Sequence, residues 1–348
     1  MHSLNIGNFK NQCIVDRWLK KIFLLFFLLF FFCFQSFADN KIYQSGPLIK
    51  DDTNGTWFDR SLYVYGVIIV VAGEVGGSKA VPEEWPKKIA QVIKMMLNPN
   101  DPLINSTAQK KVIKTLRGDP GTLHENLPTG QRVAYGGCRY YKPCPLKDDG
   151  IQKWPGYEAW LDSHATNDMV WYKNPESRFT GDDDINEVLE HLMHTIHLFG
   201  VRGGVEGSEE ALKWASDWFD EDFQNAELWQ AMREAIDNNV FNVRDYGNGN
   251  PKNPDIAHVM MKEYMYLLNY NMWEFGKEFW EGGSLSPEWN NNSRDPDGIK
   301  KNNPLGYKLF QKYFAPVLSK PDKNMLRDMF KNNDKGDALA GLSGYVAD

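Results

Sequence analysis

Acidic and imidazole side chains are concentrated in one short stretch of the sequence, between residues 184 and 200. Three of the chain's seven histidines fall there within seven residues, and no lysine or arginine occurs from residue 182 to residue 198. Neutral imidazole nitrogen together with carboxylate oxygen is the ligand set that a borderline divalent metal requires. The stretch therefore predicts a metal site, with zinc as the expected ion, and its candidate residues are Glu187, Glu190, His191, His194 and His197.

The same stretch predicts an amphipathic helix over residues 184–199. Asp184 and Glu187 have the spacing of a capping box, and Gly200 follows the last apolar residue of the pattern. At about 100° per residue, the candidate side chains fall within an arc of roughly 120°, opposite an apolar face. Two other interpretations fit this pattern: a solvated helix face whose acids and imidazoles pair with one another, and an acid–base site without a metal.

A further ligand is expected from the apolar segment 256–268. Glu263 is the one carboxylate in that segment. Burying an acid without a partner is costly, so an ion or one of the histidines would stabilise it. The alternative is an ion pair with Lys262 or with an arginine at the surface. Tyr264, the next residue, is a candidate proton donor to an oxyanion.

The helix resembles the site helix of zincin-like metallopeptidases. Those enzymes combine an α+β lobe with a helix that carries H-E-x-x-H, or its inverted form H-x-x-E-H, and take a third ligand from a downstream helix. Residues 190–194, Glu-His-Leu-Met-His, are similar to the first motif with its first two residue types exchanged. Residues 187–191, Glu-Val-Leu-Glu-His, are similar to the inverted motif with glutamate in place of the first histidine.

This resemblance implies a hydrolase that uses a metal-activated water. Glu190 is the expected base that takes the proton of this water as it attacks a carbonyl group. The expected metal ligands are His191, His194 and Glu263. Glu187 and His197 would be further ligands or would fix the tautomers of the ligating rings. A peptide or a polysaccharide is the expected substrate.

The first 38 residues have the pattern of a secretory signal peptide. Two lysines at positions 20 and 21 precede an apolar run over 22–34, and Ser36-Phe37-Ala38 follows with small residues where a signal peptidase cleaves. The run is about thirteen residues long, short of the roughly 18–20 needed to cross a bilayer, so no stable membrane anchor is expected. We therefore expect a secreted or periplasmic protein, cleaved near Ala38.

Export to an oxidising compartment would determine the state of the cysteines. Cys138 and Cys144 are the two cysteines that remain after cleavage, and in an oxidising compartment such a pair is expected to form a disulfide. The formal charge of −7 comes without a basic cluster in the mature region, which argues against a nucleic-acid partner.

Hydrophobic periodicity predicts an α+β fold with two lobes. For residues 39–181, a mixed β/α lobe is expected, with strands at 62–71, 132–135 and 168–172 and helices at 82–96 and 109–116. For residues 182–348, a mostly helical lobe is expected, with helices at 184–199, 208–219, 225–238, 255–275 and 305–318. The site helix would then lie between the two lobes, in a zincin-like arrangement.

A second class of function competes with the hydrolase. It is a secreted glycan- or ligand-binding protein that has a structural or vestigial metal site and no catalysis. Tryptophans near glycine, proline or charged residues would stack on a sugar ring, and the candidates are Trp154, Trp160, Trp273, Trp280 and Trp289. The simpler expectation is that these large rings fill the core.

Overall fold

A computed structural model describes the chain at residues 42–51, 58–74, 79–135, 157–167, 169–172, 181–215, 222–246, 254–280 and 288–330. The chain divides into two compact units, Met1–Tyr43 and Gln44–Asp348, and every element below lies in the second. The predicted signal peptide and the pair Cys138 and Cys144 lie outside the described residues. The predicted lobe boundary between residues 181 and 182 stays a prediction.

A mixed five-stranded sheet comes from the N-terminal half of the chain. Its strands, in spatial order, are β1 (Ile49–Lys50), β2 (Phe58–Val64), β3 (Val67–Ala72), β4 (Thr129–Tyr135) and β5 (Met169–Tyr172). β1, β2 and β3 pair antiparallel, whereas β3, β4 and β5 run parallel. Parallel neighbours need a crossover between them, and each of the two crossovers here contains helix.

One predicted strand was wrong: residues 62–71 contain a hairpin and not a single strand. β2 and β3 are joined at Tyr65 and Gly66, which have φ angles of 46° and 90°. Two successive residues with positive φ match a type I′ turn, whose twist suits an antiparallel pair. A continuous β-branched and aromatic run hid this turn, because Tyr65 is not a usual residue at such a position.

Two helices lie between β3 and β4, as the sequence predicted: α2 (Glu84–Met96) and α3 (Ser106–Arg117). Trp85 and Ile89 on the apolar face of α2 have no exposed surface. Asn105 caps α3 by accepting a hydrogen bond from the N–H of Ala108, and Gly118 ends it in the left-handed conformation. A short helix, α5 (Tyr157–Ser163), precedes β5.

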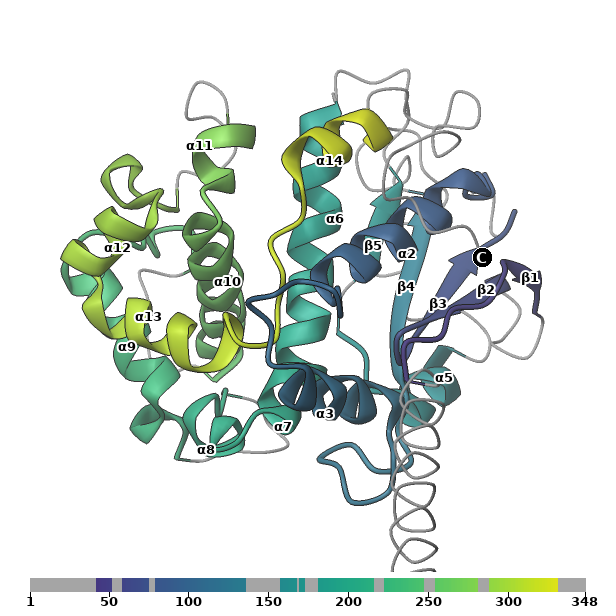
Figure 1. The fold of residues 1–348 in the computed structure, drawn as a ribbon, viewed down its shortest axis with the longest axis horizontal. Helices are drawn as coiled ribbons and strands as arrows, with labels where there is room; N and C mark the ends of the chain where they lie inside the picture. The colour runs from purple at the N-terminus through teal and green to yellow at the C-terminus, as the bar shows by residue number, and fades with distance from the viewer. Residues whose placement is uncertain are drawn as a thin grey trace, which may run out of the picture. The chain divides into compact units, whose positions relative to one another are not determined.

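The C-terminal half is mostly helical, which confirms the predicted α+β class. Its helices are α6 (Gly181–Ile196), α7 (Arg202–Gly204), α8 (Ser208–Ala211), α9 (Glu227–Asp237), α10 (Pro254–Met272), α11 (Phe275–Phe279), α12 (Pro296–Asn302), α13 (Pro304–Leu309) and α14 (Lys323–Phe330). Figure 1 shows α6 between the sheet and α10, and α6 contacts both. Among the described residues, no helix is both long and apolar enough to cross a membrane.

The sequence predicted that the site helix ends before Gly200, but the helix continues past this residue. It continues through a π-helical turn, His197–Val201, into α7. A Cβ at Gly200 would lie 2.9 Å from Leu116 of α3, and one at Gly204 would lie 2.4 Å from the Cα of Val112. Both glycines therefore allow this helical segment to approach α3 closely, and Gly200 lies inside the segment rather than at its end.

We expect Gly204→Ala to lower the free energy of unfolding by about 1–3 kcal/mol, the usual cost of overpacking, because the new methyl group meets the backbone of α3. Urea denaturation of both proteins measures the difference. Gly46→Ala is the matched control, since a Cβ there has no atom within 4 Å. Equal destabilisation by the two substitutions would contradict the close packing of α7 on α3.

Candidate metal centre

Helix α6 is fixed on both sides, and this holds the candidate residues in place. Its apolar face is fully buried, with Val188, Leu192 and Ile196 at 0% exposure. Near its C-terminal end, Thr195 donates a hydrogen bond of 2.6 Å to the side-chain oxygen of Gln131 on β4. The opposite face contains the acids and imidazoles, as helical periodicity predicted.

Three of the candidate side chains converge on one place. Glu190, His191 and His194 each offer a ligand atom, and these atoms lie within 4.8 Å of one another. His191 and His194 are 8% and 1% exposed, so this part of the helix face is not a solvated one. Their rings meet edge to face, with centroids 5.9 Å apart. A group of this composition could hold a metal ion.

Glu263 reaches the same cluster from α10. Its Oε2 lies 3.4 Å from Nε2 of His194, while its Oε1 lies 3.7 Å from Nζ of Lys262. Both partners considered from the sequence, the histidine and the lysine, are therefore present. A carboxylate from the helical half thus meets the imidazoles of α6.

Glu187 holds the ring of His191 in position. Its Oε1 lies 3.0 Å from Nε2 of His191 and accepts a 3.0 Å hydrogen bond from the backbone N–H of Trp171 on β5. A carboxylate that is bonded to a ring nitrogen orients the imidazole and selects its tautomer. Through Glu187, the edge of the sheet therefore determines how one candidate ligand points.

Burial and neighbouring charges bring the pKa of Glu190 close to neutral. Burial raises the pKa of this carboxyl group to about 7; among the charges around it, His191 and His194 lower it, while Glu263 and Glu187 raise it. A carboxyl group with a pKa near 7 exchanges its proton readily at physiological pH. Glu190 therefore has the property that a general base needs.

His197 lies apart from the three groups that converge. Its ring is fully buried and packs on Phe314, with centroids 4.6 Å apart. Burial lowers the pKa of His197 to about 3, and the positive charge of His194 acts in the same direction. The structure thus places His197 one turn beyond the cluster as a neutral ring.

Tyr264 faces a different part of the fold. Its hydroxyl donates a 2.6 Å hydrogen bond to Asn303, and its ring packs against Phe241 and Trp289. The phenol next to the cluster is that of Tyr266, whose ring centroid lies 5.6 Å from that of His194.

Two residues that the sequence analysis did not identify, Tyr246 and Glu288, lie near the cluster. Tyr246 donates a 2.8 Å hydrogen bond to Oε1 of Glu288, 42 residues away in the chain. Burial raises the pKa of both groups, and the negative charge of Glu263 raises each further. Neither residue belongs to a motif or a periodic segment, so no local signal in the sequence could have identified the pair.

Comparison of the chain with protein-family models, with curated proteins and with solved structures finds no match. The candidate metal centre therefore rests on the geometry of the described residues.

A partly buried histidine, His124, packs against the segment that follows the cluster. Its ring meets Phe199 edge to face at 5.4 Å, and burial lowers the pKa of His124 to about 4, helped by the positive charge of Arg202. Since the ordinary pKa of histidine is about 6.5, the unfolded chain binds more protons than the folded chain between these two values.

We therefore expect His124 to lower the free energy of unfolding by on the order of 1–2 kcal/mol as the pH is lowered from 7 to 5. His124→Gln removes this titration. Urea denaturation at both pH values should show a flatter pH dependence for the variant. Parallel pH dependences for the variant and the wild type would contradict a neutral His124 in the folded state.

Proposed function

We propose that the protein is a metal-dependent hydrolase, most similar to a divergent zincin-like metallopeptidase. In this proposal, the ion is held by His191, His194 and Glu263. The observation that carries it is the convergence of buried imidazoles and carboxylates from two helices that are distant in sequence. Zinc is the proposed metal, because the donors are histidine nitrogen and carboxylate oxygen.

The spacing of one pair of donor atoms fits such an ion. Two ligands of a tetrahedral zinc, each about 2.0–2.2 Å from the metal, lie roughly 3.3–3.6 Å apart. Nε2 of His194 and Oε2 of Glu263 are separated by 3.4 Å. The charges fit as well, because Glu187, Glu190 and Glu263 gather there and a divalent cation would offset their mutual repulsion.

The residues around the ion would divide the work of hydrolysis. A bound divalent ion lowers the pKa of a coordinated water from 15.7 to near 7. Glu190 would accept a proton as the water oxygen bonds to the substrate carbonyl carbon, and would return this proton to the leaving group when the scissile bond breaks. Glu187 would keep the ring of His191 in its binding orientation.

The remaining expectations belong to the same proposal. They are export of the chain, a peptide or polysaccharide substrate, and the absence of a nucleic-acid partner and of a membrane anchor. In the competing proposal, the protein binds a glycan or another ligand without catalysis. Trp154 lies outside the described residues, and the other candidate tryptophans are buried, which supports a packing role for them: Trp160, Trp273, Trp280 and Trp289.

Metal content tests the first half of the proposal. Purified protein should carry close to one zinc per chain by elemental analysis, and His191→Ala combined with His194→Ala should lose it, because both imidazole donors are gone. His164→Ala, a histidine that stacks on Trp160 away from the cluster, should retain the metal. Wild-type protein that stays metal-free after dialysis against zinc would end the proposal, whatever the variants do.

Glu190→Gln separates catalysis from metal binding. The amide has the same shape but cannot accept the proton, so hydrolysis should drop by about 10²–10⁴-fold while the zinc content stays unchanged. A library of quenched-fluorescent peptides, read at equal zinc occupancy, measures the change. Wild-type activity in this variant would show that Glu190 is not the base, and loss of the zinc would make it a ligand instead.

A further inference from the structure

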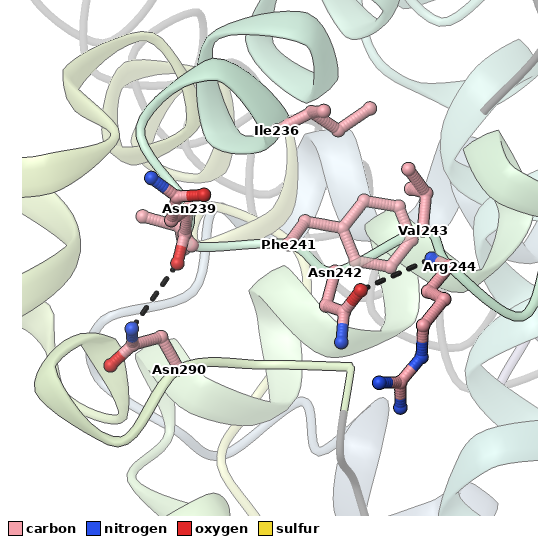
Figure 2. Close-up of a pocket in the computed structure, with 8 residues that line it drawn as sticks. Ile236, Asn239, Phe241, Asn242, Val243, Arg244 and Asn290 are labelled. Carbon is pink, nitrogen blue, oxygen red and sulfur yellow. Dashed lines mark hydrogen bonds between the residues drawn. The ribbon is translucent and has the colours of Figure 1, made fainter. Parts of the chain in front are cut away.

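A polar pocket of about 520 Å³ lies at the end of α9. Figure 2 shows the residues that line it, which come from the end of α9, the segment after it, and Asn290. We call it the arginine pocket, because Arg244 is the one charged residue among those that line it.

The pocket has a fixed framework, since its wall is an extended segment. Phe241 and Val243 are buried while Asn242 and Arg244 are exposed, the alternation of a strand with one face on the core. In Figure 2, the side chains of Asn242 and Arg244 point away from the side that holds Phe241 and Val243. Backbone bonds fix this segment to residues 288–290: Asn242 N–H donates to Glu288 at 2.6 Å, and Asn290 N–H donates to Val240 at 2.9 Å.

The guanidinium of Arg244 is available to a ligand. Its side chain is 71% exposed, and its ion-pair partner among the described residues is Asp245, at 3.7 Å. Within the same residues, this guanidinium makes no hydrogen bond. In a chain with a net charge of −7, a pocket lined by a cation and several amides is a distinct place for an anionic group.

The two segments that line the arginine pocket also carry Tyr246 and Glu288, which are close enough to Glu263 to sense its charge. The segment that contains Asn242 and Arg244 continues to Tyr246, and the segment that contains Asn290 begins with Glu288. Tyr246 and Glu288 are joined by a 2.8 Å hydrogen bond, and the charge of Glu263 raises the pKa of both. A molecule that lies along residues 242–246 would therefore reach from Arg244 toward the cluster.

We propose that the arginine pocket binds a carboxylate of the substrate, which makes an acidic peptide the preferred substrate class; this inference rests on the proposed function. The planar guanidinium of Arg244 matches a carboxylate through two parallel N–H bonds. Asn242 accepts the backbone N–H of Arg244 through its Oδ1, at 3.1 Å, which fixes the backbone that carries the guanidinium. The arginine pocket would thus determine which substrate binds and would add no catalytic group.

Binding of two short peptides to the full chain, with metal removed by chelation, tests the pocket by itself. The probes are acetyl-Ala-Glu-Ala-amide and acetyl-Ala-Gln-Ala-amide, followed by ligand-observed NMR. We expect the glutamate peptide to bind at least tenfold more tightly, and Arg244→Gln to abolish this difference. Arg233→Gln, at a half-buried arginine on α9 that pairs with Asp237, is the control and should preserve it. Equal or undetectable binding of the two peptides to wild type would overturn the inference.

A second measurement links the pocket to the metal. Zinc-loaded protein is titrated with monohydroxamates of dicarboxylic acids of four to eight carbons, and with alkyl hydroxamates of the same length. At one chain length, the carboxylate should strengthen binding at least tenfold, and Arg244→Gln should remove the gain while leaving the zinc content unchanged. No gain at any length would overturn the link. If the glutamate peptide binds more tightly, as expected, but the wild-type protein takes up no zinc, the proposed function is refuted and the arginine pocket is not.

Discussion

Burial of charge is the constraint on which the rest of the structure depends. Helix α6 lies between a sheet and α10, so its acids and imidazoles are largely removed from water. A carboxylate in such a place is stable only with a hydrogen bond, a cation or a proton. Glu187 uses the backbone of Trp171 and the ring of His191. Burial instead raises the pKa of Glu190 to about 7, and a bound metal ion would stabilise the charged form of this group.

Several features of this site follow from local rules and were predicted for that reason. A period of 3.6 residues fixes which side chains share a helix face, so the stripe from Glu187 to His194 could be derived without knowledge of the fold. Glu263 was predicted on a different ground, because a single acid in an apolar helix needs a partner. In the N-terminal half, β3, β4, β5, α2 and α3 followed from the same periodicities, whereas β1, α5 and the turn at Tyr65 did not.

Other features depend on contacts between distant segments, which periodicity does not encode. Tyr246 and Glu288 meet because two loops pair by backbone bonds, and each loop is unremarkable by itself. Gly204 is explained only by Val112 of α3, which lies far away in the sequence. The direction of the Tyr264 side chain could not be predicted, since the rotation of α10 depends on its packing against Asn303 and its neighbours.

Diffraction data collected at the zinc absorption edge, from crystals of the zinc-loaded protein, would test the central claim most directly. The account predicts one anomalous peak on the polar face of α6, about 2.0–2.2 Å from a ring nitrogen of both His191 and His194 and within bonding distance of a Glu263 oxygen. A peak elsewhere on the chain, or none with zinc in excess, would contradict it. In that case, the buried acids of α6 would be balanced by protons and not by a metal.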